Sequence, residues 1–128
     1  SAIIPKVKGG SIMKQEAFTM SLLFDTYGAL LTEKQQTYFD LYYNQDLSLA
    51  EIAEQEGISR QGVHDAISRS EALLASFERV TGCVAREQKL RHALAAITAE
   101  AQPLLQAEDP ATRQGAQRIL AAVDSLKE

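Results

Sequence analysis

The chain has 128 residues, of which 45% are hydrophobic and 23% are charged. This composition favours a folded globular protein over a disordered one, and the length suits one domain or one domain with an appendage. The 17 acidic and 13 basic residues give a net charge of −4. Such a balance opposes strong non-specific affinity for DNA, because Lys and Arg contacts to phosphates supply most of that affinity. The single cysteine excludes an internal disulfide and fits a reducing cytosol, so we expect a cytoplasmic protein.

The sequence contains no pattern typical of an enzyme, a metal site or a membrane span. Its two histidines and one cysteine lie far apart and form no ligand cluster. It has no glycine-rich phosphate loop, no HExxH and no GxSxG motif. No apolar run approaches the roughly 18 residues that a membrane span needs. We therefore expect a non-enzymatic protein without cofactor or metal and without membrane insertion.

The chain divides into three expected parts. Residues 1–12, with two lysines and a Gly-Gly pair, are interpreted as a flexible leader. Residues 13–80 are predicted to form a four-helix domain, and residues 81–128 a C-terminal extension of two helices. The fold class is therefore all-α, since the chain shows neither alternating β-branched runs nor hairpin turn signals.

The first two helices are predicted from apolar spacing and from a cap. Apolar residues recur every three or four positions between Lys14 and Leu31, which predicts one amphipathic helix. Thr32 and Gln35 then match a capping box that opens a second helix ending near Asn44. The apolar stripe of the first helix comprises Phe18, Leu22, Leu23, Tyr27, Leu30 and Leu31.

The next two helices have clear start and stop signals. Ser48 and Glu51 form a second capping box, and Gly57 ends this short third helix by adopting positive φ. Ser59 caps a fourth helix that continues to Val80, before a break at residues 81–82.

The last two helices follow this break. A fifth helix is expected from about Val84 to Gln102, ended or kinked by Pro103. A sixth has Asp109 as its N-cap and Pro110 in its first turn. Cys83 is interpreted as a small packed side chain.

The segment from Ser48 to Ile67 has the pattern of a helix-turn-helix. Small or apolar residues occupy the slots where two helices cross closely. Glu56 breaks the pattern just before the turn glycine: either it bends outward to solvent, or the helix end is looser than usual. The slots are Ile52, Ala53, Ile58, Val63 and Ala66.

The outward face of the fourth helix carries the candidate nucleic-acid-binding residues. Arg60 and Gln61 lie in the first turn, where a recognition helix meets base edges, and Arg pairs with guanine and Gln with adenine. Ser59 and Arg69 suit phosphates. His64 is interpreted as a solvent-facing polar residue rather than a catalytic one. The full set is Ser59, Arg60, Gln61, His64, Asp65, Ser68 and Arg69.

The stretch "LLTEKQQTYFDLYYNQDLSLAEIAEQEGISRQGVHDAISRSEALL" resembles the YlxM family of small bacterial proteins and, more distantly, region 4 of sigma-70-type factors. The resemblance covers roughly residues 13–95. It implies an all-helical fold, a DNA-binding role through the seven residues named above, and a link to the signal recognition particle pathway. The sequence departs from the family pattern at Glu56, where an apolar or aromatic residue is usual, and at Gly62, where alanine is common.

Two functions follow as expectations. The first is a DNA-binding regulator that uses the fourth helix and forms a homodimer through the helices after Gly82, because one helix-turn-helix buries a modest area. The second is an adaptor that binds a protein or ribonucleoprotein partner, such as a component of the signal recognition particle, through the acidic third helix.

Overall fold

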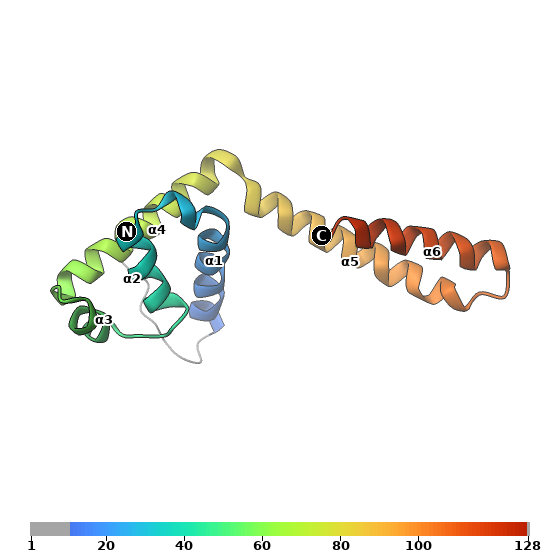
Figure 1. Ribbon diagram of the computed structural model, residues 1–128. Helices are drawn as coiled ribbons and strands as arrows, with labels where there is room; N and C mark the ends of the chain where they lie inside the picture. The colour runs from blue at the N-terminus through green and yellow to red at the C-terminus, as the bar shows by residue number, and fades with distance from the viewer. Residues whose placement is uncertain (1–10, 128) are drawn as a thin grey trace. The chain divides into compact units, whose positions relative to one another are not determined.

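The computed structural model describes residues 11–127, with side chains from Glu16 onward, and this part of the chain is all-α (Figure 1). It falls into two compact units, one reaching Val84 and the other starting at Ala85, a few residues beyond the expected boundary at 80–81. No helix in the described range is long and apolar enough to cross a membrane. The helices are α1 (Ser11–Tyr27), α2 (Glu33–Tyr43), α3 (Leu49–Glu56), α4 (Arg60–Thr81), α5 (Cys83–Ala101) and α6 (Pro110–Ser125), with 3-10 turns η1 (Gly28–Leu30) and η2 (Gln102–Gln106).

The helix boundaries follow the caps predicted from the sequence. Both capping boxes are present: the Thr32 and Ser48 hydroxyls each accept a backbone N–H three residues on, and the side chains of Gln35 and Glu51 reach back. Gly57 ends α3 with φ of 71°. Asp109 caps α6 as expected. The expected leader lies mostly outside the described residues, and α1 begins at Ser11, so the last two positions of the leader are helical.

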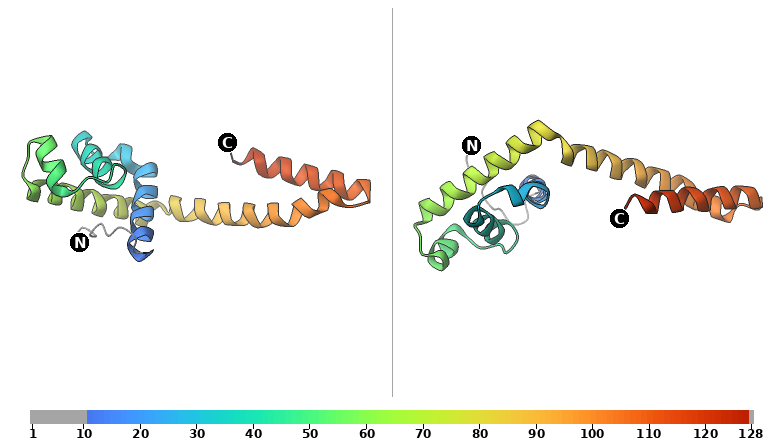
Figure 2. Two further views of the ribbon diagram at one scale, coloured as in Figure 1. Left: turned by 90° about the horizontal axis from the view of Figure 1, so that it is seen from below. Right: turned by 45° about the horizontal axis from the view of Figure 1, so that its top comes forward.

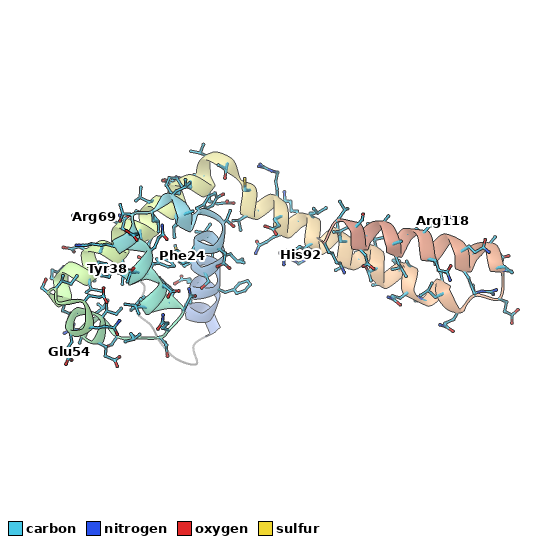
Figure 3. All side chains as sticks on the ribbon, viewed as in Figure 1. Phe24, Tyr38, Glu54, Arg69, His92 and Arg118 are labelled. Atoms are coloured by element: carbon cyan, nitrogen blue, oxygen red, sulfur yellow. The ribbon has the colours of Figure 1, made fainter. Side chains whose placement is uncertain are left out.

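The first unit has two hydrophobic clusters. One joins α2, α3 and α4 around Ile52, Val63 and Ile67, which are fully buried. The other joins α1, α2 and α4 around Phe39 and Leu74. Figure 3 shows the side chains that fill the space between these helices. Because both clusters use α4, this helix is held on several sides and its rotation is fixed by the core.

Two tyrosine–glutamate pairs also attach α4 to its neighbours. Tyr43 of α2 donates a hydrogen bond to the carboxylate of Glu71, which is 3% exposed. Tyr27 of α1 donates to Glu78 Oε1 at 2.5 Å, and the same oxygen accepts the N–H of Val84 at 3.0 Å. These polar contacts join residues far apart in the sequence and satisfy groups that would be unfavourable if buried alone.

The second unit is a hairpin of α5 and α6. The two helices run antiparallel and separate toward the C-terminal end of α6 (Figure 2). Its buried hydrophobic side chains are few and mostly small: Leu94, Ala101, Ala116 and Val123.

Three expectations about individual side chains are wrong. Phe18 and Leu30 are 63% and 67% exposed, although both belong to the expected stripe of the first helix. Leu30 leaves the stripe because η1 replaces the last α-helical turn and changes the side-chain direction. Cys83 is exposed rather than packed, because it lies in the first turn of α5 immediately after the left-handed Gly82.

Candidate nucleic-acid interface

The helix-turn-helix is formed by α3, the turn at Gly57 and α4. Ile52 and Val63 face each other's helices with no exposed surface, and Ala53, Ile58 and Ala66 pack against the same cluster. All five crossing positions therefore do what the sequence pattern predicts. This close crossing fixes α4 relative to α3.

The turn is closed despite Glu56. The N–H groups of Gly57 and Ile58 both bond to the carbonyl of Ala53, at 3.0 and 3.2 Å. A Glu56 carboxylate oxygen lies 3.4 Å from the amide nitrogen of Gln55 on the exposed side of the helix. Of the two alternatives that the sequence left open, these backbone hydrogen bonds exclude the loosened helix end, and the Glu56 side chain is partly exposed.

The start of α4 presents both side chains and backbone donors. Ser59 caps the helix, its hydroxyl accepting the N–H of Gly62 at 2.9 Å. Arg60 and Gln61 are exposed. The backbone N–H groups of these two residues have no carbonyl one turn back within the helix. They can therefore donate hydrogen bonds to an anion at the positive end of the helix dipole.

A row of polar residues continues along the exposed face. Gln61, Asp65 and Arg69 are exposed and lie four residues apart, which places them on one side of α4. Gln61 Nε2 donates to Asp65 Oδ1 at 2.9 Å. Figure 3 shows Arg69 on α4 and Glu54 on α3.

Asp65 is held as an anion by its neighbours. The hydrogen bond from Gln61 lowers the pKa of Asp65 below its usual value, with smaller contributions from His64 and Arg69. His64 Nδ1 lies 3.5 Å from Asp65 Oδ1, and the His64 side chain is partly exposed. Any ligand that accepts a hydrogen bond from the Gln61 amide must therefore compete with Asp65.

Ser68 does not face outward as predicted. Its hydroxyl oxygen is buried and finds no hydrogen-bond partner among the described residues. The reason is helical geometry: Ser68 is one residue after buried Ile67 and three before buried Glu71, so it lies at the edge of the inward face.

The acidic residues of α4 are largely turned away from the exposed face. The helix carries three acidic and three basic residues. Glu71 is buried against Tyr43, and Glu78 is half-buried against Tyr27, whereas Arg60, Arg69 and Arg79 are exposed. The preceding segment, residues 16–56, differs from α4 because it has eight acidic residues and one basic residue. The exposed charge of α4 is therefore positive, and that of the preceding helices is negative.

The two inward-facing glutamates were missed from the sequence. Glu71 has a recognisable signal, since it lies four residues after Ile67 and three before Leu74, inside the apolar stripe of α4. Its tyrosine partner 28 residues away has no local signal. Within residues 11–127 no group of His, Cys, Asp and Glu could hold a metal ion.

The family model and the similar proteins found by comparison all belong to one family. The model of the UPF0122 family, described as "Putative helix-turn-helix protein, YlxM / p13 like", matches residues 14–111. A UPF0122 protein of Symbiobacterium thermophilum is 46% identical over 104 residues, which cover 81% of this chain and 91% of that protein. One from Halalkalibacterium halodurans is 40% identical over 116 residues, 90% of this chain and 100% of that protein. One from Clostridium kluyveri is 58% identical over 64 residues, 50% of this chain and 58% of that protein.

Proposed function

Because the chain belongs to the UPF0122 family of YlxM/p13-like helix-turn-helix proteins, we propose that it is a cytoplasmic DNA-binding regulator that reads DNA with the N-terminal half of α4. The observation that carries this proposal is the exposed row of Gln61, Asp65 and Arg69, which starts beside the free amides at the N-terminus of α4. The family is one of helix-turn-helix proteins and not a family of enzymes.

In this function α4 enters the major groove with its first turn toward the bases. Arg60 pairs with guanine, and Gln61 with adenine after releasing Asp65. Arg69 and the backbone amides at residues 60–61 hold phosphates and set the register of the helix on the duplex. Asp65 repels phosphates and so limits the affinity for every sequence.

The test is selection of bound fragments from genomic DNA at controlled salt, followed by titration of the recovered site. Gln61→Ala should relax the preference at one base pair, with a loss of about 1–3 kcal/mol on the selected site. Arg69→Ala should weaken all sequences similarly and reduce the slope of log K against log salt by about 0.9. Arg118→Ala, the same change on exposed α6, is the control and should alter neither. Failure to enrich any sequence at moderate salt would refute the proposal.

A second candidate function is favoured by the acidic surface before Gly57. Residues 16–56 carry the eight acidic residues noted above, and Glu54 is exposed on α3. Such a surface suits a basic protein or ribonucleoprotein, and the family resemblance suggests a component of the signal recognition particle. Under this alternative Glu54→Lys weakens partner capture from nuclease-treated lysate, whereas Gln61→Ala does not.

A further inference from the structure

The hairpin of α5 and α6 buries only part of its apolar surface. Residues in α5 and η2 follow a spacing of four and three: Leu90, Leu94, Ile97, Ala101 and Leu104. Residues in α6 repeat it: Thr112, Ala116, Ile119, Val123 and Leu126. These are the a and d positions of a heptad, the pattern of helices that pack side by side.

The side chains at heptad position a and those at position d differ in burial. The four side chains at position a of these stripes (Leu94, Ala101, Ala116, Val123) are at most 8% exposed. The five apolar side chains at position d are between 44% and 60% exposed: Leu90, Ile97, Leu104, Ile119 and Leu126. Position e adds two partly buried leucines, Leu105 and Leu120, and is polar at its other places. The hairpin therefore leaves its d row about half exposed, and in a helical bundle such a row packs against further helices.

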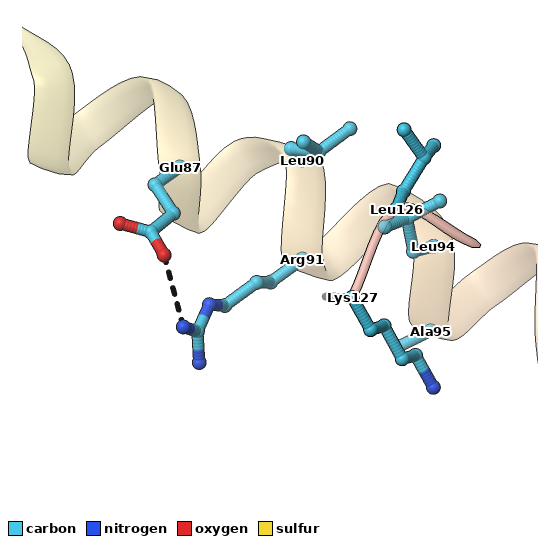
Figure 4. A pocket seen from close by; sticks show the side chains of 7 residues that line it. All are labelled: Glu87, Leu90, Arg91, Leu94, Ala95, Leu126 and Lys127. Carbon is cyan, nitrogen blue, oxygen red and sulfur yellow. Dashed lines mark hydrogen bonds and ion pairs between the residues drawn. The ribbon is translucent and has the colours of Figure 1, made fainter. Parts of the chain in front are cut away.

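The exposed row forms one continuous strip from both helices. Leu90 and Leu126 line a cavity of about 480 Å³ at the open end of the hairpin (Figure 4). Ile97, Leu104 and Ile119 line a second hollow near the connection between the helices. Both hollows draw d-row side chains from α5 or η2 and from α6, so the strip lies on a single face of the hairpin.

We propose that this strip is a homodimer interface, in which two hairpins pack face to face and antiparallel to form a four-helix bundle. The hairpin unit from Ala85 to Glu128 has 44 residues, close to the length below which a unit needs help from another chain to be stable. It contains six basic and six acidic residues, so two copies meet without net charge repulsion. The remaining residues carry the entire net charge of −4.

The charges beside the two hollows select the antiparallel arrangement. Arg91 and Lys127 line the cavity at the open end, where Arg91 also pairs with Glu87 at 2.9 Å. Glu100 lines the other hollow. When the hairpins run antiparallel, each open end meets the partner's connecting end, and the cations approach Glu100. A parallel arrangement instead brings like ends together. The dimer interface is independent of the proposed DNA contacts on α4.

Sedimentation velocity of the full chain over a range of concentrations tests the interface. The unmodified protein should sediment as a dimer. Ile97→Glu should raise the dimer dissociation constant by on the order of 100-fold, because the new charge would be buried between the hairpins. Ala99→Glu, on the exposed outer side of α5, introduces the same charge and should leave the dimer intact. Circular dichroism checks that each variant keeps its helices.

Charge reversal tests the antiparallel order without disturbing the hairpin core. Glu100→Lys should weaken the dimer by about tenfold, and adding Lys127→Glu in the same chain should restore it. Glu54→Lys, the same reversal on exposed α3 of the first unit, is the control. A wild-type monomer at all concentrations, or a dimer that tolerates Ile97→Glu, overturns the interface. A dimer broken by Ile97→Glu but unaffected by Glu100→Lys overturns the antiparallel arrangement.

Discussion

Replacing Gly57 by alanine tests the turn on which the helix-turn-helix depends. The residue has φ of 71° and ψ of 30°, and a Cβ atom built there meets no heavy atom within 4 Å. The effect of the substitution therefore comes from the backbone alone. An L residue in the left-handed region costs about 1–2 kcal/mol. Alanine also restricts the unfolded chain, which offsets about 0.4–1 kcal/mol. We expect a net loss of about 1 kcal/mol in the free energy of unfolding of the first unit.

Tyrosine fluorescence is the appropriate assay for this loss. The chain has four tyrosines and no tryptophan, and all four tyrosines lie between Tyr27 and Tyr43, so the signal reports the first unit alone. The thermal midpoint should fall by about 4–8 °C. Gly115→Ala, in the middle of α6 where a Cβ would meet only the Arg118 side chain at 3.8 Å, should leave this midpoint unchanged. A midpoint for Gly57→Ala equal to or above that of the wild type would refute the assigned turn.

Three further predictions concern polar side chains. Burial raises the pKa of Glu71, so Glu71→Gln should stabilise the first unit at pH 7 while keeping an acceptor for Tyr43. This gain should shrink as pH falls toward 4, because the wild-type carboxyl is then protonated too; urea unfolding at both pH values checks it. Ser68→Ala removes a buried unpaired hydroxyl and should stabilise the first unit by about 0.5–1 kcal/mol without changing DNA affinity, as titration would show. Hydrogen bonds at the α6 cap, chiefly from a threonine hydroxyl, lower the pKa of Asp109. Its stabilising effect should be present above pH 4 and be lost as pH falls through that lowered pKa; circular dichroism of Asp109→Ala against wild type measures this.

The sequence predicts the local features of the fold well. Thr32, Ser48 and Gly57 mark helix ends because caps and a left-handed glycine act over three or four residues, all visible in the sequence. Exposure is harder to predict, because it depends on which neighbour covers a face. Phe18 has the spacing of a core residue, yet it remains exposed.

The candidate site was predicted only in part, because its membership also depends on which side chains are exposed. Helical periodicity correctly places Gln61 and Arg69 on the exposed face of α4. It fails for Ser68, which lies where the inward and outward faces meet and where a small rotation of the helix decides burial. The hydrogen bond between Gln61 and Asp65 follows from their spacing of four residues, but the inward positions of Glu71 and Glu78 require the tertiary contacts of α4.

The acidic composition of the chain is a poor guide to the surface of α4. A net charge of −4 opposes DNA binding only if the acidic residues face the phosphates. Eight of the 17 acidic residues lie in residues 16–56, before α4 begins, and the buried Glu71 and half-buried Glu78 accept hydrogen bonds from tyrosines. On the exposed side of α4 this leaves Asp65, whose carboxylate accepts the amide of Gln61. Asp65→Asn therefore removes the negative charge that an approaching phosphate would meet on this face. If α4 binds DNA as we propose, this substitution should raise the affinity for every sequence, which titration against wild type measures.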